Sequence, residues 1–120
     1  MKPSRKIRLL LVDDHFVVRS GLAGSLGVDP EIEIAAECGT GEEALTAFRK
    51  HRPDVVLMDW RLPGISGVEA TARIRAEFPD ARILQLTIYE GDEDIFRAAE
   101  AGVRGYLPKS ISRRELLAAI

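Results

Sequence analysis

The chain has 120 residues, of which 46% are hydrophobic and 30% are charged, and its formal net charge is −2 at pH 7. A chain of this length forms one domain with a buried core, and a net negative charge argues against direct binding of this segment to nucleic acid. Cys38 is the only cysteine, which excludes an internal disulfide and suits a reducing cytoplasm. The apolar stretch after the basic start is too short for a signal peptide and ends in charge, and no stretch has the length of a membrane span.

Short apolar runs alternate with helix-like patterns five times, with one unit in about 22 to 28 residues. The runs predict strands over 7–12, 31–38, 55–59, 82–87 and 105–108. The intervening patterns predict helices over 15–26, 41–52 and 67–78, a fourth that closes at Gly102 and a fifth that opens after Ser112. This alternation of strands and helices is typical of right-handed crossover connections in a parallel sheet, so the expected fold class is α/β.

Capping boxes and apolar faces support the predicted helices. The capping boxes pair Thr40 with Glu43, Ser66 with Glu69, and Ser112 with Glu115. The apolar faces consist of Phe16, Val17, Val18, Leu22 and Leu26 in the first helix, Ala44, Leu45, Ala47 and Phe48 in the second, and Val68, Ala72 and Ile74 in the third. We expect these faces to pack on the sheet.

The rest of the chain is organised around the run 55–59. Its four apolar residues lie between Pro53 and a Pro63-Gly64 turn, which is typical of a strand buried on both faces of a parallel sheet. Asp59 ends the run, at the edge where open α/β sheets bind ligands. A carboxylate there is partly desolvated, which is costly unless something uses or neutralises it. The plainer alternative is an acid that caps a helix or a turn.

Polar residues also lie at the ends of three other strands. Asp13 and Asp14 follow the first strand, Thr87 ends the fourth and Lys109 follows the fifth. Because the carboxyl ends of parallel strands meet at one edge, we expect these side chains to converge with Asp59. Three neighbouring carboxylates repel one another, and Mg²⁺, which prefers oxygen ligands, would relieve that repulsion. A metal, a lysine, a hydroxyl and a nucleophilic carboxylate around one point form a phosphoryl-transfer site.

The same residues belong to a set of motifs that characterises one family. The motifs are Leu11-Val12-Asp13-Asp14, Leu57-Met58-Asp59 with Leu62-Pro63, Gly64 with Gly67, Thr87, and Gly105-Tyr106-Leu107 with Lys109. Over nearly the whole chain this pattern resembles the response-regulator receiver domains of two-component signalling. The stretch 101–107 and the run Thr87-Ile88-Tyr89 resemble most the subfamily joined to a LuxR-type (NarL-type) helix-turn-helix.

The resemblance implies a flavodoxin-like (CheY-like) sheet of five parallel strands in the order 2-1-3-4-5, flanked by five helices. It makes Asp59 the phosphoacceptor. It assigns Mg²⁺ to Asp14, Asp59 and the backbone carbonyl of Arg61, and it makes Asp13 the holder of a water on the metal.

The resemblance also implies roles for the last two strands and for partners. Lys109 and Thr87 would hold the phosphoryl oxygens, and Tyr106 would turn inward as a switch when Thr87 moves. Residues 1–120 would be a cytoplasmic receiver, phosphorylated by a sensor histidine kinase and able to form a homodimer, and it would catalyse only its own phosphorylation and dephosphorylation. DNA would be bound only through a helix-turn-helix domain beyond Ile120.

The sequence fits three alternative functions to different degrees. A stand-alone receiver would act through protein contacts or phosphorelay and would need no DNA-binding domain. An enzyme of the haloacid-dehalogenase type also uses a strand-end aspartate, but it needs an acid two positions further on, where this chain has Arg61. No G-x-G-x-x-G motif follows the first strand, which argues against dinucleotide binding.

Three residues near the motifs need separate interpretations. Pro108 precedes Lys109, whereas many receivers have a proline after the lysine, so the family's cis bond is not expected and the last strand loses a backbone donor. Trp60 either shapes access to Asp59 or packs in its own loop. His15 could be taken for a metal ligand, but the favoured interpretation is a histidine that opens or caps a helix.

Overall fold

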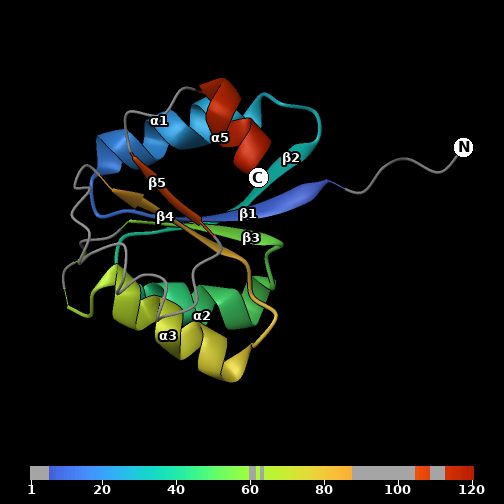
Figure 1. Ribbon diagram of the computed structural model, residues 1–120. Helices are drawn as coiled ribbons and strands as arrows, with labels where there is room; N and C mark the ends of the chain where they lie inside the picture. Colours follow the sequence, from blue (N-terminus) through green and yellow to red (C-terminus); the bar gives the residue numbers. More distant parts are fainter. Residues whose placement is uncertain (1–5, 60–61, 63, 88–104, 109–112) are drawn as a thin grey trace, which may run out of the picture.

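The computed structural model describes residues 6–59, 62, 64–87, 105–108 and 113–120, and Figure 1 shows a sheet with helices on both faces. The strands are β1 (Ile7–Val12), β2 (Ile32–Cys38), β3 (Val55–Asp59), β4 (Ile83–Thr87) and β5 (Gly105–Pro108). The helices of this part of the chain are α1 (Phe16–Gly27), α2 (Gly41–His51), α3 (Gly67–Glu77) and α5 (Arg113–Ala119). α1 and α5 cover one face of the sheet, and α2 and α3 cover the other. The helix expected to close at Gly102 lies outside the described residues.

The strands are parallel and lie in the order β2-β1-β3-β4-β5, which confirms the predicted sheet. β3 is central, and all five of its residues are buried, as the apolar run predicted. Val12 pairs with Met58, and Asp59 pairs with Leu86. The carboxyl ends of β1, β3 and β4 therefore meet at one edge of the sheet.

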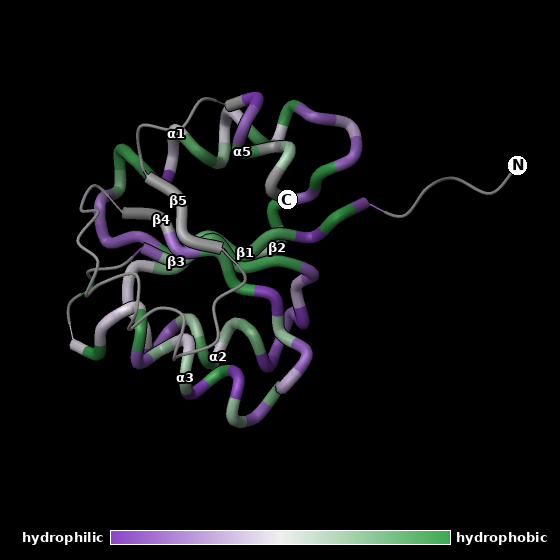
Figure 2. The backbone as a smooth tube through the Cα atoms, in the orientation of Figure 1, coloured by the Kyte–Doolittle hydropathy of each residue, from purple (hydrophilic) through white to green (hydrophobic). Residues whose placement is uncertain are grey.

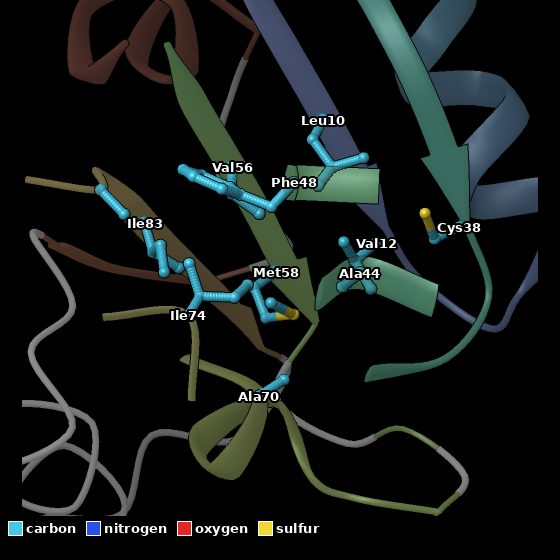
Figure 3. Packing of buried hydrophobic residues seen from close by; sticks show 11 residues of the cluster. Leu10, Val12, Cys38, Ala44, Phe48, Val56, Met58, Ala70, Ile74 and Ile83 are labelled. Carbon is cyan, nitrogen blue, oxygen red and sulfur yellow. The ribbon is translucent and has the colours of Figure 1, made fainter. Parts of the chain in front are cut away.

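Two apolar cores hold the strands in this register. Successive side chains of a strand point to opposite faces, so Leu10 and Val12 pack toward α2 and α3, while Leu9 and Leu11 pack toward α1 and α5. Figure 3 shows the first of these clusters, and Figure 2 shows the hydrophobic strands between the two helical layers. Each fully buried aliphatic side chain contributes roughly 1.5–3 kcal/mol. No helix among the described ranges is long and apolar enough to cross a membrane.

The predicted capping boxes of α2 and α3 are present in modified form. Thr40 Oγ1 accepts a hydrogen bond of 3.1 Å from the backbone N–H of Glu43. The Glu43 carboxylate reaches back one residue further than a capping box requires and accepts from the N–H of Gly39 at 3.0 Å. Ser66 Oγ caps α3 by accepting from the N–H of Glu69 at 3.1 Å. Both helices therefore begin at the predicted residues.

Two of the predicted apolar faces need correction. Phe16 and Val17, at the start of α1, are 70% and 80% exposed, and the buried residue of that helix is Leu26. Three consecutive helical residues span more than half a turn, so residues 16–18 cannot all face the sheet. Ala72 of α3 is also exposed. The buried face of α3 runs through positions 67, 70, 71 and 74, which have the spacing i, i+3, i+4, i+7.

Candidate functional site

A group of side chains that could bind a metal lies at the carboxyl edge of the central strands. β1 and β3 pair up to Val12 and Met58, so the next residues, Asp13 and Asp59, lie side by side at the edge of the sheet. Asp13, Asp14, His15 and Asp59 each offer one ligand atom, and these atoms lie within 4.8 Å of one another. Asp13 and Asp59 are buried, with 3% and 4% of their surface exposed, whereas Asp14 and His15 open to solvent. The group therefore has a buried side, formed by Asp13 and Asp59, and a solvent-exposed side, formed by Asp14 and His15.

Asp13 is held by both elements that flank β1. Its backbone N–H donates to the carbonyl oxygen of Cys38 at 3.0 Å, and its Oδ1 accepts from the N–H of His15 at 2.8 Å. Arg19, in the second turn of α1, donates from Nη1 to the carbonyl oxygen of Asp13 at 2.8 Å. Arg19 Nε lies 3.4 Å from a carboxylate oxygen of Glu37 in β2. These contacts fix the backbone of Asp13 between β2 and α1.

His15 stands at the N-cap position of α1, so it opens the helix as predicted, but its side chain makes no capping hydrogen bond. Nδ1 lies 3.2 Å from Oδ1 of Asp13 and 3.2 Å from Oδ1 of Asp14. The backbone turn directs the imidazole toward the acids and away from the helix N–H groups.

The donor set suits Mg²⁺. That ion prefers carboxylate and carbonyl oxygens and retains several waters, and this site has two buried carboxylates with a third at its solvent side. Carboxylates removed from water at this spacing repel one another, and a divalent cation offsets the repulsion. The carbonyl of Arg61, expected as a further ligand, lies outside the described residues.

The structure places the other predicted site residues only in part. Thr87 ends β4, which pairs with β3, so its backbone lies at the same edge of the sheet as Asp59. Tyr106 lies in β5, which pairs with β4. The side chains of Thr87 and Tyr106, and the whole of Trp60, Arg61 and Lys109, fall outside the described residues.

Two residues near the site were not singled out from the sequence. Arg19 is the only charged residue of α1, and a single charge in an otherwise uncharged helix could have indicated a specific contact. Gln85 interrupts the apolar β4 and is fully buried. Its Nε2 donates to Thr71 Oγ1 at 3.2 Å, and the Thr71 hydroxyl donates to the carbonyl of Gly67 at 2.8 Å. This chain of hydrogen bonds ties β4 to the first turn of α3.

With the sheet order and the acidic group in place, comparison with known proteins decides the family. Residues 9–120 match the response regulator receiver domain. The chain belongs to this family.

Individual relatives of this receiver are of the LuxR type. It is 42% identical over 114 residues to the DNA-binding transcriptional activator DevR/DosR of Mycobacterium tuberculosis, which covers 95% of this chain and 52% of that protein. It is 36% identical over 114 residues to the response regulator VraR of Staphylococcus aureus, covering 95% and 54%. The structure of a LuxR-family response regulator from Aurantimonas has a TM-score of 0.90 at 40% identity, covering 94% and 81%. The receiver spans about half the length of the curated relatives it matches.

Proposed function

We propose that this receiver accepts a phosphoryl group on Asp59 from a histidine of a sensor kinase, in a reaction that requires Mg²⁺. The observation that carries the proposal is the position of Asp59, which is buried at the end of the central strand beside Asp13 and Asp14. Membership of the receiver family supports the reaction class.

The reaction is a transfer between two protein side chains. A carboxylate oxygen of Asp59 attacks the phosphorus, the phosphorus–nitrogen bond of the phosphohistidine breaks, and its electron pair returns to the imidazole. The product on this chain is an acyl phosphate. Mg²⁺, bound by Asp14, Asp59 and the carbonyl of Arg61, would supply positive charge that offsets the carboxylates and the phosphoryl oxygens. Asp13, held by the N–H of His15, would orient a water of that ion.

Thr87 and Lys109 are proposed to bind the phosphoryl oxygens through a hydroxyl and an ammonium group. The pairing of β4 with β3 supports this role for Thr87, since it brings the end of β4 to the edge where Asp59 lies. Movement of Thr87 would be followed by Tyr106 on the neighbouring β5. The charge added by the phosphoryl group would thereby shift the surface formed by β4 and β5 from one conformation toward another.

The surface beside the site suits a protein partner. Phe16 and Val17 lie directly after the acidic pair and His15, and they are 70% and 80% exposed. Exposed apolar side chains next to a reactive group suggest an interface. We propose that the sensor kinase covers this first turn of α1 when it presents its phosphohistidine to Asp59.

The proposed output is control of transcription through a DNA-binding domain that this segment does not include. Two observations support it: the similarity to a DNA-binding transcriptional activator, and the fact that the matched relatives are about twice as long. The receiver would act in the cytoplasm, could form a homodimer, and would turn over no separate substrate. A stand-alone receiver acting through phosphorelay is the alternative, and a natural stop codon near Ile120 would favour it.

Intact mass spectrometry tests the phosphoacceptor. The chain is incubated with a small acyl phosphate and Mg²⁺, and we expect one labile phosphoryl adduct. The adduct should be absent without metal and absent in Asp59→Asn. An adduct of equal yield in Asp59→Asn would reject the proposal.

A further inference from the structure

We infer that Gln85 is a positioning residue for the transfer of the phosphoryl group to Asp59. Its hydrogen bond to Thr71 ties β4 to the first turn of α3, where the loop that follows Asp59 ends. The inference rests on the proposed function, in which that loop supplies a carbonyl ligand to Mg²⁺ and the end of β4 supplies a hydroxyl to the phosphoryl group. Gln85 would keep these two parts of the site in register with each other.

Gln85 lies next to the phosphoacceptor in the register of the sheet. Met58 pairs with Gln85 across β3 and β4, and the next pair is Asp59 with Leu86. Thr87 is two positions beyond Gln85 on the same strand. A displacement of β4 at Gln85 therefore also displaces Thr87 relative to Asp59.

The side chain of Gln85 forms a buried bridge to α3. Gln85 and Thr71 are both fully buried. Nε2 of Gln85 donates to Thr71 Oγ1 at 3.2 Å, and the Thr71 hydroxyl donates its single hydrogen to the carbonyl oxygen of Gly67, the first residue of α3, at 2.8 Å. Because that hydrogen is already used, Thr71 can only accept from Gln85, which fixes the orientation of the amide.

Stability alone does not account for this bridge. Oε1 of Gln85 is buried and has no hydrogen-bond partner in the part of the chain that the structure describes. A buried acceptor without a partner costs free energy, and a leucine of similar size would avoid that cost. A glutamine at this position gains its value from holding two elements in one arrangement, which a phosphoryl-transfer site requires.

The geometry of the reaction predicts the effect of losing the bridge. A displacement of about 1 Å in a reacting group can slow an enzymatic step by about 10²-fold. Without the hydrogen bond, β4 and α3 keep their apolar packing, but their relative position is less restricted. Thr87 and the loop after Asp59 would then surround the phosphoryl group less often in the reactive arrangement, so transfer would slow in a protein that is still folded.

The test measures the rate at which acetyl phosphate labels the chain at saturating Mg²⁺, by intact mass spectrometry, and the free energy of unfolding in urea. Gln85→Leu and Thr71→Val each remove the bridge, alone and combined in a double variant. Thr71→Ser keeps the hydroxyl and is the conservative replacement. Ile83→Val is the matched control, because it trims a fully buried side chain two positions earlier on β4 without touching the bridge.

We expect labelling to slow about ten-fold in Gln85→Leu and in Thr71→Val, a loss usual for residues that position a metal site. The double variant should be no slower, because both substitutions remove the same hydrogen bond. Thr71→Ser and Ile83→Val should be labelled at nearly the unsubstituted rate.

Two results would overturn this inference and leave the proposed function intact. One is labelling of Gln85→Leu at the unsubstituted rate, and the other is equal slowing in Thr71→Ser or Ile83→Val. If the unsubstituted chain acquired no Mg²⁺-dependent label, the proposed function would fail, and the role of Gln85 with it.

Discussion

The guanidinium of Arg19 and the backbone carbonyl of Asp13 are joined by a hydrogen bond that links α1 to the end of β1. Replacing Arg19 by Met keeps the length of the side chain but removes this donor and the ion pair with Glu37. The carbonyl and carboxylate of Asp13 should then become less well positioned, and we expect Mg²⁺ affinity to fall about ten-fold. Arg73→Met is the matched control, because Arg73 forms an exposed ion pair with Glu69 on α3, away from the site. Equal Mg²⁺ affinities in the two variants would refute the role of Arg19.

The buried pair of Gln85 and Thr71 predicts opposite effects on stability for two substitutions. Oε1 of Gln85 is buried and has no hydrogen-bond partner among the described residues. In Gln85→Leu this acceptor disappears, while the Thr71 hydroxyl keeps the carbonyl of Gly67, so the free energy of unfolding should stay the same or rise by about 1 kcal/mol.

Thr71→Val should instead lower it by about 1–3 kcal/mol, because Nε2 of Gln85 loses its acceptor inside the protein. Urea unfolding measures both values. A large loss of stability in Gln85→Leu would contradict this interpretation.

Cys38 gives the fold a pH dependence in the alkaline range. Burial, with the charge of Glu43 as a lesser cause, raises the pKa of the Cys38 thiol from 9.0 to about 11. The folded state therefore keeps the proton that the unfolded state has lost between pH 9 and 11, so this stabilising contribution is present below pH 9 and disappears as the pH rises through 11. Unfolding measured from pH 8 to 11 should show a steeper loss of stability in the unsubstituted chain than in Cys38→Ala. Parallel curves would show that the thiol does not contribute.

The exposed first turn of α1 predicts different results for two phosphate donors, the sensor kinase and a small acyl phosphate. Val17 is 80% exposed, so Val17→Ser should change the free energy of unfolding by no more than about 0.5 kcal/mol. If the kinase covers this turn, transfer from its phosphohistidine should slow several-fold, while labelling by a small acyl phosphate should not change. Val28→Ser serves as the control, because Val28 is 74% exposed just beyond the other end of α1. Equal transfer rates for both variants would place the kinase elsewhere.

Two glycines should respond in opposite directions to alanine. A Cβ at Gly41 would lie 2.6 Å from Cγ1 of Ile65 and 3.1 Å from Cβ of Ala70, so Gly41→Ala should destabilise by about 1–3 kcal/mol. A Cβ at Gly24 within α1 meets nothing within 4 Å, so Gly24→Ala should stabilise by about 0.5–1 kcal/mol. Thermal unfolding of the two variants measures the contrast. An unchanged melting temperature in Gly41→Ala would mean that Ile65 shifts to make room for the added methyl group at little cost.

Much of the molecule could be predicted from the sequence because its strands are apolar runs with clear ends. The run 55–59 has the composition of a strand covered on both faces, and Asp59 stands where that run stops. The sheet order followed from a resemblance carried by many residues along the chain, and β1 to β5 have that order. The start of α3 was visible in Ser66, since a cap depends on residues only three positions apart.

The predictions that failed concern which way a side chain points. Local spacing alone put Phe16 on the packed face of α1, but the structure exposes it. His15 opens α1 as predicted, and only the structure shows that its imidazole turns toward two carboxylates. The sequence alone determined the strands, the starts of α2 and α3 and the acid at the end of β3, because these depend on neighbours along the chain. Only the tertiary structure decided that Arg19 binds the carbonyl of Asp13 and that Gln85 meets Thr71, because such contacts depend on how each helix is rotated and placed against the sheet.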